Sequence, residues 1–275
     1  MLRRLATFSL CSCVLALVLV GCGGESGKAT LNKKPVTTTT TTAPVVTVPP
    51  TSAPVPTNVS YIATVKPEIT KVSIYDAPAT TAPAQQFDNP WLYDPSIPTT
   101  TVPQVFLVKE RRSDGWVQVL LPVRPNGSTG WLKSADVTLA VNPFRIEVQL
   151  GAHTITVNKG DEVVYTGPVA VGATDPPLPD SGKPTPTPTG EYYLRVLLQA
   201  PDPTTVYGPY AYGLSSHSDA LESFSGGDAE IGIHGNNDAS VLGQNVTHGC
   251  IRMDNDAITM LSKQLPLGTP VTVNA

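Results

Sequence analysis

Short segments in which apolar and polar residues alternate recur through this 275-residue chain from about residue 60 to its end. Residues 144–150 read Phe-Arg-Ile-Glu-Val-Gln-Leu and alternate strictly, and residues 191–198 form another run typical of a strand. A period of two places successive side chains on opposite faces of a strand. Turn residues, such as those at positions 158–161, separate the runs. The pattern predicts a mostly β protein.

One helical pattern interrupts the strands, near the C-terminus. Ile258, Leu261 and Leu265 recur at helical spacing and would share one apolar face, and Asp254 or Asn255 can cap the first turn. Residues 266–268, Pro-Leu-Gly, would end this segment. We therefore expect a single short helix in the C-terminal part of the chain.

The alternating segments fall into two domains. Residues 60–140 hold short strands that suggest a small barrel, and residues 142–275 are sufficient for a further domain. The runs at 116–119 (Trp-Val-Gln-Val) and 130–132 (Gly-Trp-Leu) resemble a bacterial SH3-like module. Such a module binds peptidoglycan or a partner, or serves as a rigid spacer with its tryptophans in its own core; we favour the spacer.

A segment rich in Pro, Ala and Thr, residues 77–103, interrupts the first domain. Its composition predicts a long loop. We expect its two large aromatic residues, Trp91 and Tyr93, to pack back onto the barrel.

The N-terminus predicts export. Residues 1–21 combine Arg3 and Arg4 with an uncharged apolar stretch, which is typical of a signal peptide. The run Leu-Val-Gly-Cys at 19–22 resembles the bacterial lipobox, which implies lipidation of Cys22 and anchoring at the outer face of the cell membrane, facing the wall. An ordinary secretory signal or a retained anchor is the alternative. Residues 22–59 would then be the lipidated cysteine and a Pro/Thr-rich linker.

The charge of the chain excludes one class of partner. The formal net charge is −4 at pH 7, and loss of Arg3 and Arg4 with residues 1–21 would make it −6. The sequence has no basic run to contact phosphates, so we expect no nucleic acid partner.

Cys250 would be the only free thiol of the exported chain. Cys11 and Cys13 fall in the predicted signal peptide, and Cys22 lies at its processing site. A lone cysteine in an exported protein has no partner for a disulfide, which favours a reactive thiol. His234 and His248 lie nearby in the sequence, so Cys250 is a candidate nucleophile with its base.

The residues around this cysteine resemble the catalytic domain of the L,D-transpeptidases, the YkuD type. The resemblance rests on Ile-His-Gly at 233–235 and Thr-His-Gly-Cys-Ile-Arg-Met at 247–253, with further similarity at 187–192 and 207–211. It covers roughly residues 142–275 and implies a β-rich catalytic domain with a short helix after the cysteine loop. Asn236 and Thr247 depart from the residues that are commoner at those positions of the family.

The resemblance and thiol chemistry together suggest roles for the neighbouring residues. A thiol is mostly protonated at neutral pH, and an imidazole can accept its proton. His234 is the expected base, and His248 would orient or support the thiolate. The amides of Gly249 and Cys250 are candidate oxyanion donors. The remaining positions expected to shape the site are Thr247, Gly235, Asn236 and Arg252, of which Arg252 holds a substrate carboxylate or braces the loop.

Other interpretations of these residues carry less weight. Cys250 as inert core filler does not explain the two histidines. A zinc site from His234, His248 and Cys250 lacks the usual completing ligands, so we expect no metal and no cofactor. Three tyrosines, Tyr207, Tyr210 and Tyr212, would line the substrate cleft or belong to the aromatic core.

The resemblance implies an enzyme of peptidoglycan. Cys250 would attack a tetrapeptide stem, release D-alanine and hold the stem as a thioester, and an amine of an acceptor stem would resolve it as a 3-3 cross-link. Two alternatives remain open: a hydrolytic cell-wall cysteine peptidase or L,D-carboxypeptidase, and a non-catalytic lipoprotein that tethers the wall.

Overall fold

The computed structural model of the protein describes residues 34–35, 58–93 and 101–275. The predicted signal peptide, Cys22 and nearly all of the predicted linker lie outside the described residues. Within the described part of the chain, no helix is long and apolar enough to cross a membrane. The described residues are mostly β, as the alternating pattern predicts.

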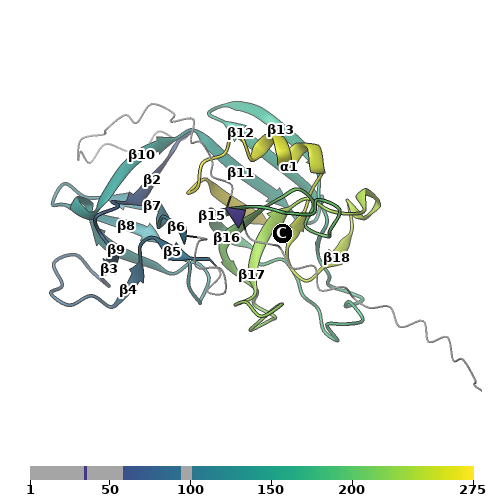
Figure 1. Ribbon diagram of the computed structural model, residues 1–275, viewed down its shortest axis with the longest axis horizontal. Helices are drawn as coiled ribbons and strands as arrows, with labels where there is room; N and C mark the ends of the chain where they lie inside the picture. The colour runs from purple at the N-terminus through teal and green to yellow at the C-terminus, as the bar shows by residue number, and fades with distance from the viewer. Residues whose placement is uncertain (1–33, 36–57, 94–100) are drawn as a thin grey trace, which may run out of the picture.

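An antiparallel sheet of five strands forms the N-terminal unit, and it lies at one end of the molecule in Figure 1. Phe106, Val119 and Leu132 are fully buried in its core. Trp131 is also buried, whereas Trp116 is only partly buried. In spatial order the strands are β10 (Val137–Asn142), β2 (Ser60–Val65), β7 (Val105–Arg111), β8 (Trp116–Leu120) and β9 (Thr129–Lys133), with a 3-10 turn η1 (Ser134–Asp136) before β10.

The insertion at 77–103 differs from the long loop that its composition predicts. It contributes strands to two small hairpins, which are β3 (Lys71–Ile74) with β4 (Gln85–Asp88) and β5 (Trp91–Leu92) with β6 (Thr101–Val102). Trp91 and Tyr93 pack against Val196, Leu198 and Ala211, which belong to the second sheet. The expectation that they pack back onto the barrel is therefore wrong. The Trp91 ring instead lies 3.8 Å from the guanidinium carbon of Arg195, a cation–π contact that the sequence spacing does not reveal.

The C-terminal unit is built on a larger sheet of nine strands, including the two-residue strand β1 (Lys34–Pro35) on β15. Two of its pairings, β11 with β20 and β17 with β19, are parallel, and the second of these carries the candidate site. The path runs β13 (Glu162–Pro168), β12 (Thr154–Lys159), β11 (Phe144–Gln149), β20 (Pro270–Asn274), β15 (Gly190–Gln199), β16 (Tyr210–His217), β17 (Glu230–His234) and β19 (Ile251–Arg252). A short parallel pair, β14 (Val171–Gly172) with β18 (Asn245–Thr247), and a 3-10 turn η2 (Ala239–Val241) complete it.

The predicted helix is α1 (Asn255–Leu261), and it begins where the capping residues suggest. The Asp254 carboxylate accepts a hydrogen bond from the Ala257 N–H at 2.9 Å, which satisfies one of the unpaired donors of the first turn. Ile258, Leu261 and Leu265 are buried in the core of the large sheet. The helix therefore closes the core immediately after the strand that follows Cys250.

The two sheets share a packed boundary. The Tyr193 side chain leaves β15 and is fully buried in the core of the five-stranded sheet. A Cβ atom at Gly268, just before β20, would lie 2.4 Å from Cγ2 of Ile62 on β2, so the backbone approaches the N-terminal unit closely there. The N-terminal unit is thus packed directly against the unit that carries Cys250.

Candidate active site

Cys250 lies immediately before β19, next to strand β17. The parallel register pairs Ile233 with Ile251 and His234 with Arg252. Continuing this register backward places Gly232 opposite Cys250, and the Gly232 N–H indeed donates to the Cys250 Sγ at 3.4 Å. A backbone donor at this position stabilises negative charge on the sulfur.

The same register places His234 and Cys250 on one face of the sheet. Ile233 and Ile251 are buried in the core of the large sheet, and side chains alternate between faces along a strand. Cys250 just before β19, Arg252 on β19, and Gly232 and His234 on β17 therefore belong to the opposite face. The predicted nucleophile and base thus belong to neighbouring strands, and the register places them on the same face of the sheet.

A tight turn presents the cysteine. The Thr247 hydroxyl accepts from the Gly249 N–H at 3.1 Å and donates to the Cys250 carbonyl at 2.6 Å. Gly249 has φ +119°, a conformation that side chains with a Cβ rarely adopt. The bond to Thr247 occupies the Gly249 amide, so the Cys250 amide is the remaining candidate of the two predicted oxyanion donors.

Two buried threonines form hydrogen bonds to the carbonyls of this turn. The sequence analysis gave neither of them a role. The Thr187 hydroxyl donates to the Gly249 carbonyl at 2.8 Å and accepts from the Gly172 N–H at 2.9 Å. The Thr185 hydroxyl donates to the Thr247 carbonyl at 3.1 Å. The sequence similarity of residues 187–192 to the L,D-transpeptidases indicated that this segment matters. It did not reveal the contact with the turn, because Thr187 lies 62 residues before Gly249 in the chain.

Replacing Gly249 with alanine should destabilise the fold. The new Cβ would lie 2.9 Å from Cδ1 of Ile231, in addition to the strain of a positive φ. Strain of this kind costs about 1–3 kcal/mol. Gly243→Ala is a matched control, since Gly243 has φ +91° and a Cβ added there would meet no atom within 4 Å. Urea unfolding should show a larger loss for Gly249→Ala; equal losses in the two variants would contradict the close packing at Gly249.

The ionisation of the pair favours a neutral resting state. Burial and, to a smaller extent, the charge of Arg252 lower the pKa of His234 to about 4, although hydrogen bonds to the backbone of Gly235 and Val206 oppose this shift. Burial raises the pKa of the Cys250 thiol, although the Gly232 N–H and Arg252 oppose this. At neutral pH the site therefore holds a thiol and an uncharged imidazole, and His234 is available as a general base.

The His234 ring is fixed by its surroundings. The residue is only 3% exposed, and Nδ1 lies 2.7 Å from the Gly235 carbonyl oxygen, which can only accept. The Tyr207 ring packs on it at a centroid distance of 5.0 Å. Burial raises the pKa of the Tyr207 hydroxyl, and a negative charge on Cys250 raises it further. Tyr207 thus forms one wall beside the pair.

Asn236 and Gly235 join β17 to the start of α1. The Asn236 N–H donates to Oδ1 of Asn255 at 2.9 Å, and Nδ2 of Asn255 returns a bond to the Asn236 carbonyl at 2.9 Å. Nδ2 of Asn236 donates to the Met253 carbonyl at 2.7 Å. A Cβ at Gly235 would lie 2.2 Å from Oδ1 of Asn255, so this junction requires glycine. These two residues brace the site.

Arg252 carries its charge on the same face as the pair. Burial lowers its pKa, while Cys250 and Tyr207 raise it. Its backbone pairs with Ala170 in both directions, at 2.8 and 2.9 Å. Within the described residues, the buried Nε of Arg252 has no hydrogen-bond partner. The backbone thus braces the loop, and the guanidinium is placed to stabilise a thiolate.

His248 is held by groups other than Cys250. Its Nε2 lies 3.1 Å from Oδ1 of Asp180, and the Phe224 ring lies 4.9 Å from its ring centre. The expectation that His248 supports the thiolate relied on an extended segment, in which residues two apart share a side. The positive φ of Gly249 interrupts that segment. The structure therefore links His248 to the loops around the turn.

Comparison with known proteins identifies the family of the chain. The profile of the L,D-transpeptidase catalytic domain, YkuD, matches residues 143–273. The protein named as the L,D-transpeptidase YkuD of Bacillus licheniformis is 33% identical over 164 residues, which are 57% of this chain and 85% of that protein. The chain belongs to the YkuD family of L,D-transpeptidases.

Other similar proteins carry the same family name. The YkuD protein of Bacillus subtilis strain 168 is 34% identical over 132 residues, and the alignment spans 48% of this chain and 66% of that relative, just under two thirds of its length. The crystal structure of L,D-transpeptidase 3 from Mycobacterium tuberculosis is 16% identical with a TM-score of 0.37, over 56% of this chain and 77% of that one. The SH3-like resemblance of the N-terminal unit lies outside the matched family profile and stays a prediction.

The three tyrosines that would line the cleft or belong to the aromatic core differ in their surroundings. Tyr212 is 1% exposed, and its hydroxyl donates to the carbonyls of Leu261 and Leu265, so it is a core residue that holds α1. Of the two interpretations of Tyr212, the structure bears out the aromatic core. Tyr210 packs on the same core, and the Tyr207 ring packs on the ring of His234. Among the described residues, no group of three or more His, Cys, Asp or Glu is placed to hold a metal ion.

Proposed function

We propose that this YkuD family member is a peptidoglycan L,D-transpeptidase that forms 3-3 cross-links through a thioester on Cys250. The observation that carries the proposal is the parallel pairing of β17 with β19, which brings Cys250 and His234 onto one face beside Arg252. A partly exposed cysteine with an uncharged imidazole on the same face is suited to nucleophilic acyl transfer.

The first half of the reaction follows from the neutral resting pair. His234 accepts the thiol proton as the Cys250 sulfur attacks the carbonyl carbon that precedes the terminal D-alanine of a tetrapeptide stem. The Cys250 amide would stabilise the oxyanion. When the amide C–N bond breaks, the imidazolium returns the proton to the leaving amine, which departs as D-alanine and leaves a thioester.

In the second half, the amine of an acceptor stem attacks the thioester carbonyl. His234 takes a proton from that amine, the C–S bond breaks, and the thiol is restored. Attack by water instead would yield a tripeptide, which is the L,D-carboxypeptidase outcome. The chemistry at Cys250 is identical in both cases, so the acceptor decides the product.

We also propose that the chain works outside the cell membrane, anchored by lipid on Cys22. The signal-like residues 1–21 and the lipobox-like run at 19–22 support this. The Pro/Thr-rich residues that follow would let the folded part reach the wall, since such segments are extended. Incorporation of labelled palmitate in wild type, and its loss in Cys22→Ala, would be the expected result.

Product analysis tests the proposed activity. We expect incubation with a tetrapeptide-stem muropeptide to release D-alanine and to form a cross-linked dimer, detected by mass spectrometry. A carbapenem, which the family resemblance implies as an acylating mimic, should add its mass to the chain at Cys250. Tripeptide without dimer would favour the hydrolytic alternative. A folded chain that gives neither product nor adduct would favour the non-catalytic tether.

A further inference from the structure

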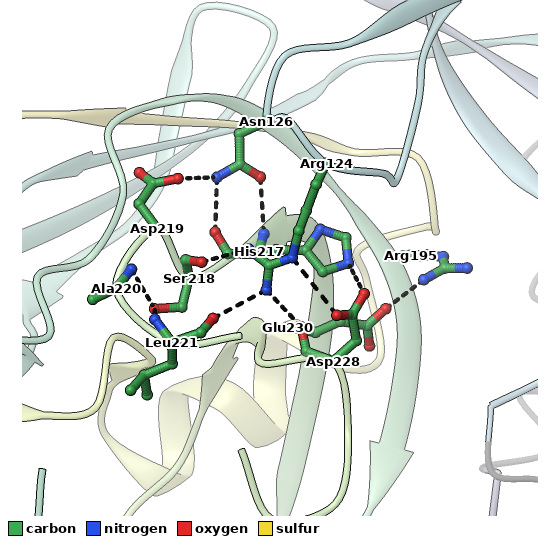
Figure 2. Close-up of polar contacts among 10 residues, drawn as sticks. All are labelled: Arg124, Asn126, Arg195, His217, Ser218, Asp219, Ala220, Leu221, Asp228 and Glu230. Atoms are coloured by element: carbon green, nitrogen blue, oxygen red, sulfur yellow. Dashed lines mark hydrogen bonds and ion pairs between the residues drawn. The ribbon is translucent and has the colours of Figure 1, made fainter. Parts of the chain in front are cut away.

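An arginine of the N-terminal unit reaches into the catalytic unit. Arg124 lies between β8 and β9, and its guanidinium donates to three carbonyls of the segment that connects β16 to β17, residues 218–229 (Figure 2). The acceptors are Ser218 at 2.6 Å, Leu221 at 3.1 Å and Asp228 at 3.0 Å. We call residues 218–229 the β16–β17 loop. Its two ends are thereby joined through one side chain.

Asn126 adds a second connection from the same part of the N-terminal unit. Its amide pairs with the His217 backbone in both directions, donating to the carbonyl at 2.7 Å and accepting from the N–H at 2.9 Å. It also donates to Oδ1 of Asp219 at 3.1 Å (Figure 2). The buried His217 in turn places Nε2 3.2 Å from Oδ2 of Asp228. The base of the loop is therefore enclosed in one polar network.

The loop itself has little apolar packing to hold it. Residues 222–228 are all exposed, and Ala229 is the buried apolar residue at its end. A segment with few buried contacts opens at low free-energy cost unless polar contacts restrain it. Arg124 donates three hydrogen bonds to the loop, whereas Asn126 donates one, so the guanidinium that ties both ends is the main polar restraint on it.

The far end of the loop reaches the cysteine turn. Phe224 and Gly227 exchange backbone hydrogen bonds at 3.0 and 2.9 Å, which forms a tight turn at the tip. The Phe224 ring, 39% exposed, packs on the ring of His248, two residues before Cys250. The loop is thus held by Arg124 of the N-terminal unit at its base, and its tip contacts His248 at the edge of the candidate active site.

We propose that Arg124 is a positioning residue through which the N-terminal unit holds the β16–β17 loop, so that Phe224 and the loop form one wall of the stem-peptide site. The inference rests on the proposed function and adds a role for the N-terminal unit. That unit would then be neither a passive spacer nor only a wall-binding module, because the substrate site is complete only when it is docked.

The test compares a large and a small reagent on the full chain. In Arg124→Ala we expect kcat/KM for D-alanine release from a tetrapeptide stem to fall about tenfold, mainly through KM, which is the size of effect that loss of hydrogen bonds to a charged group produces. The rate of Cys250 alkylation by iodoacetamide should be unchanged, because Cys250, just before β19, and His234 on β17 lie outside the β16–β17 loop. Partial unfolding would instead lower kcat/KM and raise the alkylation rate, because an exposed thiol is more accessible and loses the burial that raises its pKa.

Three further variants make the result specific. Arg112→Ala is the matched control, since Arg112 is an exposed arginine of the same unit that pairs with Asp114, and it should leave both rates unchanged. Arg124→Lys should lie between Arg124→Ala and wild type, because an ammonium cannot span the acceptors as a guanidinium does. Phe224→Ala should reproduce the rise in KM without touching the interface, which keeps the proposal testable if Arg124→Ala does not fold.

The outcomes separate the inference from the function on which it rests. An active wild type with an equally active, folded Arg124→Ala would overturn the positioning role. An unchanged KM in Phe224→Ala would overturn the assignment of the loop as a wall. A wild type that releases no D-alanine, yet is alkylated normally by iodoacetamide, would count against the proposed function. In that case amide hydrogen exchange tests the role of Arg124 in holding the loop. Faster exchange at residues 218–229 in Arg124→Ala would support this role, and unchanged exchange would refute it.

Discussion

Cys250→Ala is expected to release no measurable D-alanine from a tetrapeptide stem and to form no adduct with a carbapenem. The Cys250 sulfur forms the covalent bond to the substrate in the proposed reaction, and no other free thiol lies in the described residues. Removing the nucleophile of a covalent enzyme costs several orders of magnitude, on the order of 10⁴-fold or more in kcat. Intact mass and a D-alanine assay measure the two effects independently.

The variant must be shown to fold for this result to be meaningful. The change removes one sulfur atom that accepts from the Gly232 N–H, and the residue keeps some exposure. We therefore expect the thermal unfolding midpoint to stay within a few degrees of wild type. Cys250→Ser retains an acceptor for Gly232 and serves as the closer isostere. Substantial D-alanine release by either folded variant would refute Cys250 as the nucleophile.

The second large effect is expected for His234→Gln. General base catalysis contributes about 10²- to 10⁴-fold, so acylation at pH 7 should fall by this amount. His248→Gln should cost far less, because the contacts of the His248 ring are with Asp180 and Phe224. Pre-steady-state acylation by a carbapenem measures the step directly. A larger loss of acylation rate in His248→Gln than in His234→Gln would indicate that His248, and not His234, is the general base.

The pKa shifts of His234 and Cys250 also predict how the acylation rate changes with pH. Burial lowers the pKa of His234 to about 4, so the base stays unprotonated, and the wild-type rate should fall only as the pH drops toward that value. In His234→Gln the thiol must ionise by itself, and burial raises its pKa. The residual rate of the variant should therefore rise about tenfold per pH unit through neutrality. A variant rate that is flat with pH would contradict the neutral thiol.

The neutral pair also refines what the sequence suggested about activation. A histidine close to a cysteine can stabilise a preformed thiolate or wait as a base, and the residue types are compatible with both. Burial decides between them here, because it disfavours both charged forms, imidazolium and thiolate. The Gly232 N–H and Arg252 then stabilise the charge when it develops on the sulfur.

Contacts that join distant parts of the chain were the ones that sequence reasoning missed. Thr187 lies 62 residues from the Gly249 carbonyl that it holds, and Arg124 lies 94 residues from its Ser218 acceptor. Trp91 and Tyr93 pack on the second sheet although they belong to the insertion of the first. None of these pairings has a signal in local spacing, because hydroxyl, guanidinium and aromatic groups contact many kinds of partner.

The amino-acid pattern alone determined the β class and the helix that Asp254 caps, and it singled out Cys250 and His234 as the candidate nucleophile and base. These features depend on local periodicity, on capping residues and on a recognisable motif, and each of these signals lies in a short stretch of the sequence. The tertiary structure decided that His234 and Cys250 share a face, that Tyr212 belongs to the core, and that the N-terminal unit contacts the β16–β17 loop. These outcomes depend on strand register and on how two sheets dock, which only the packing of the whole chain settles.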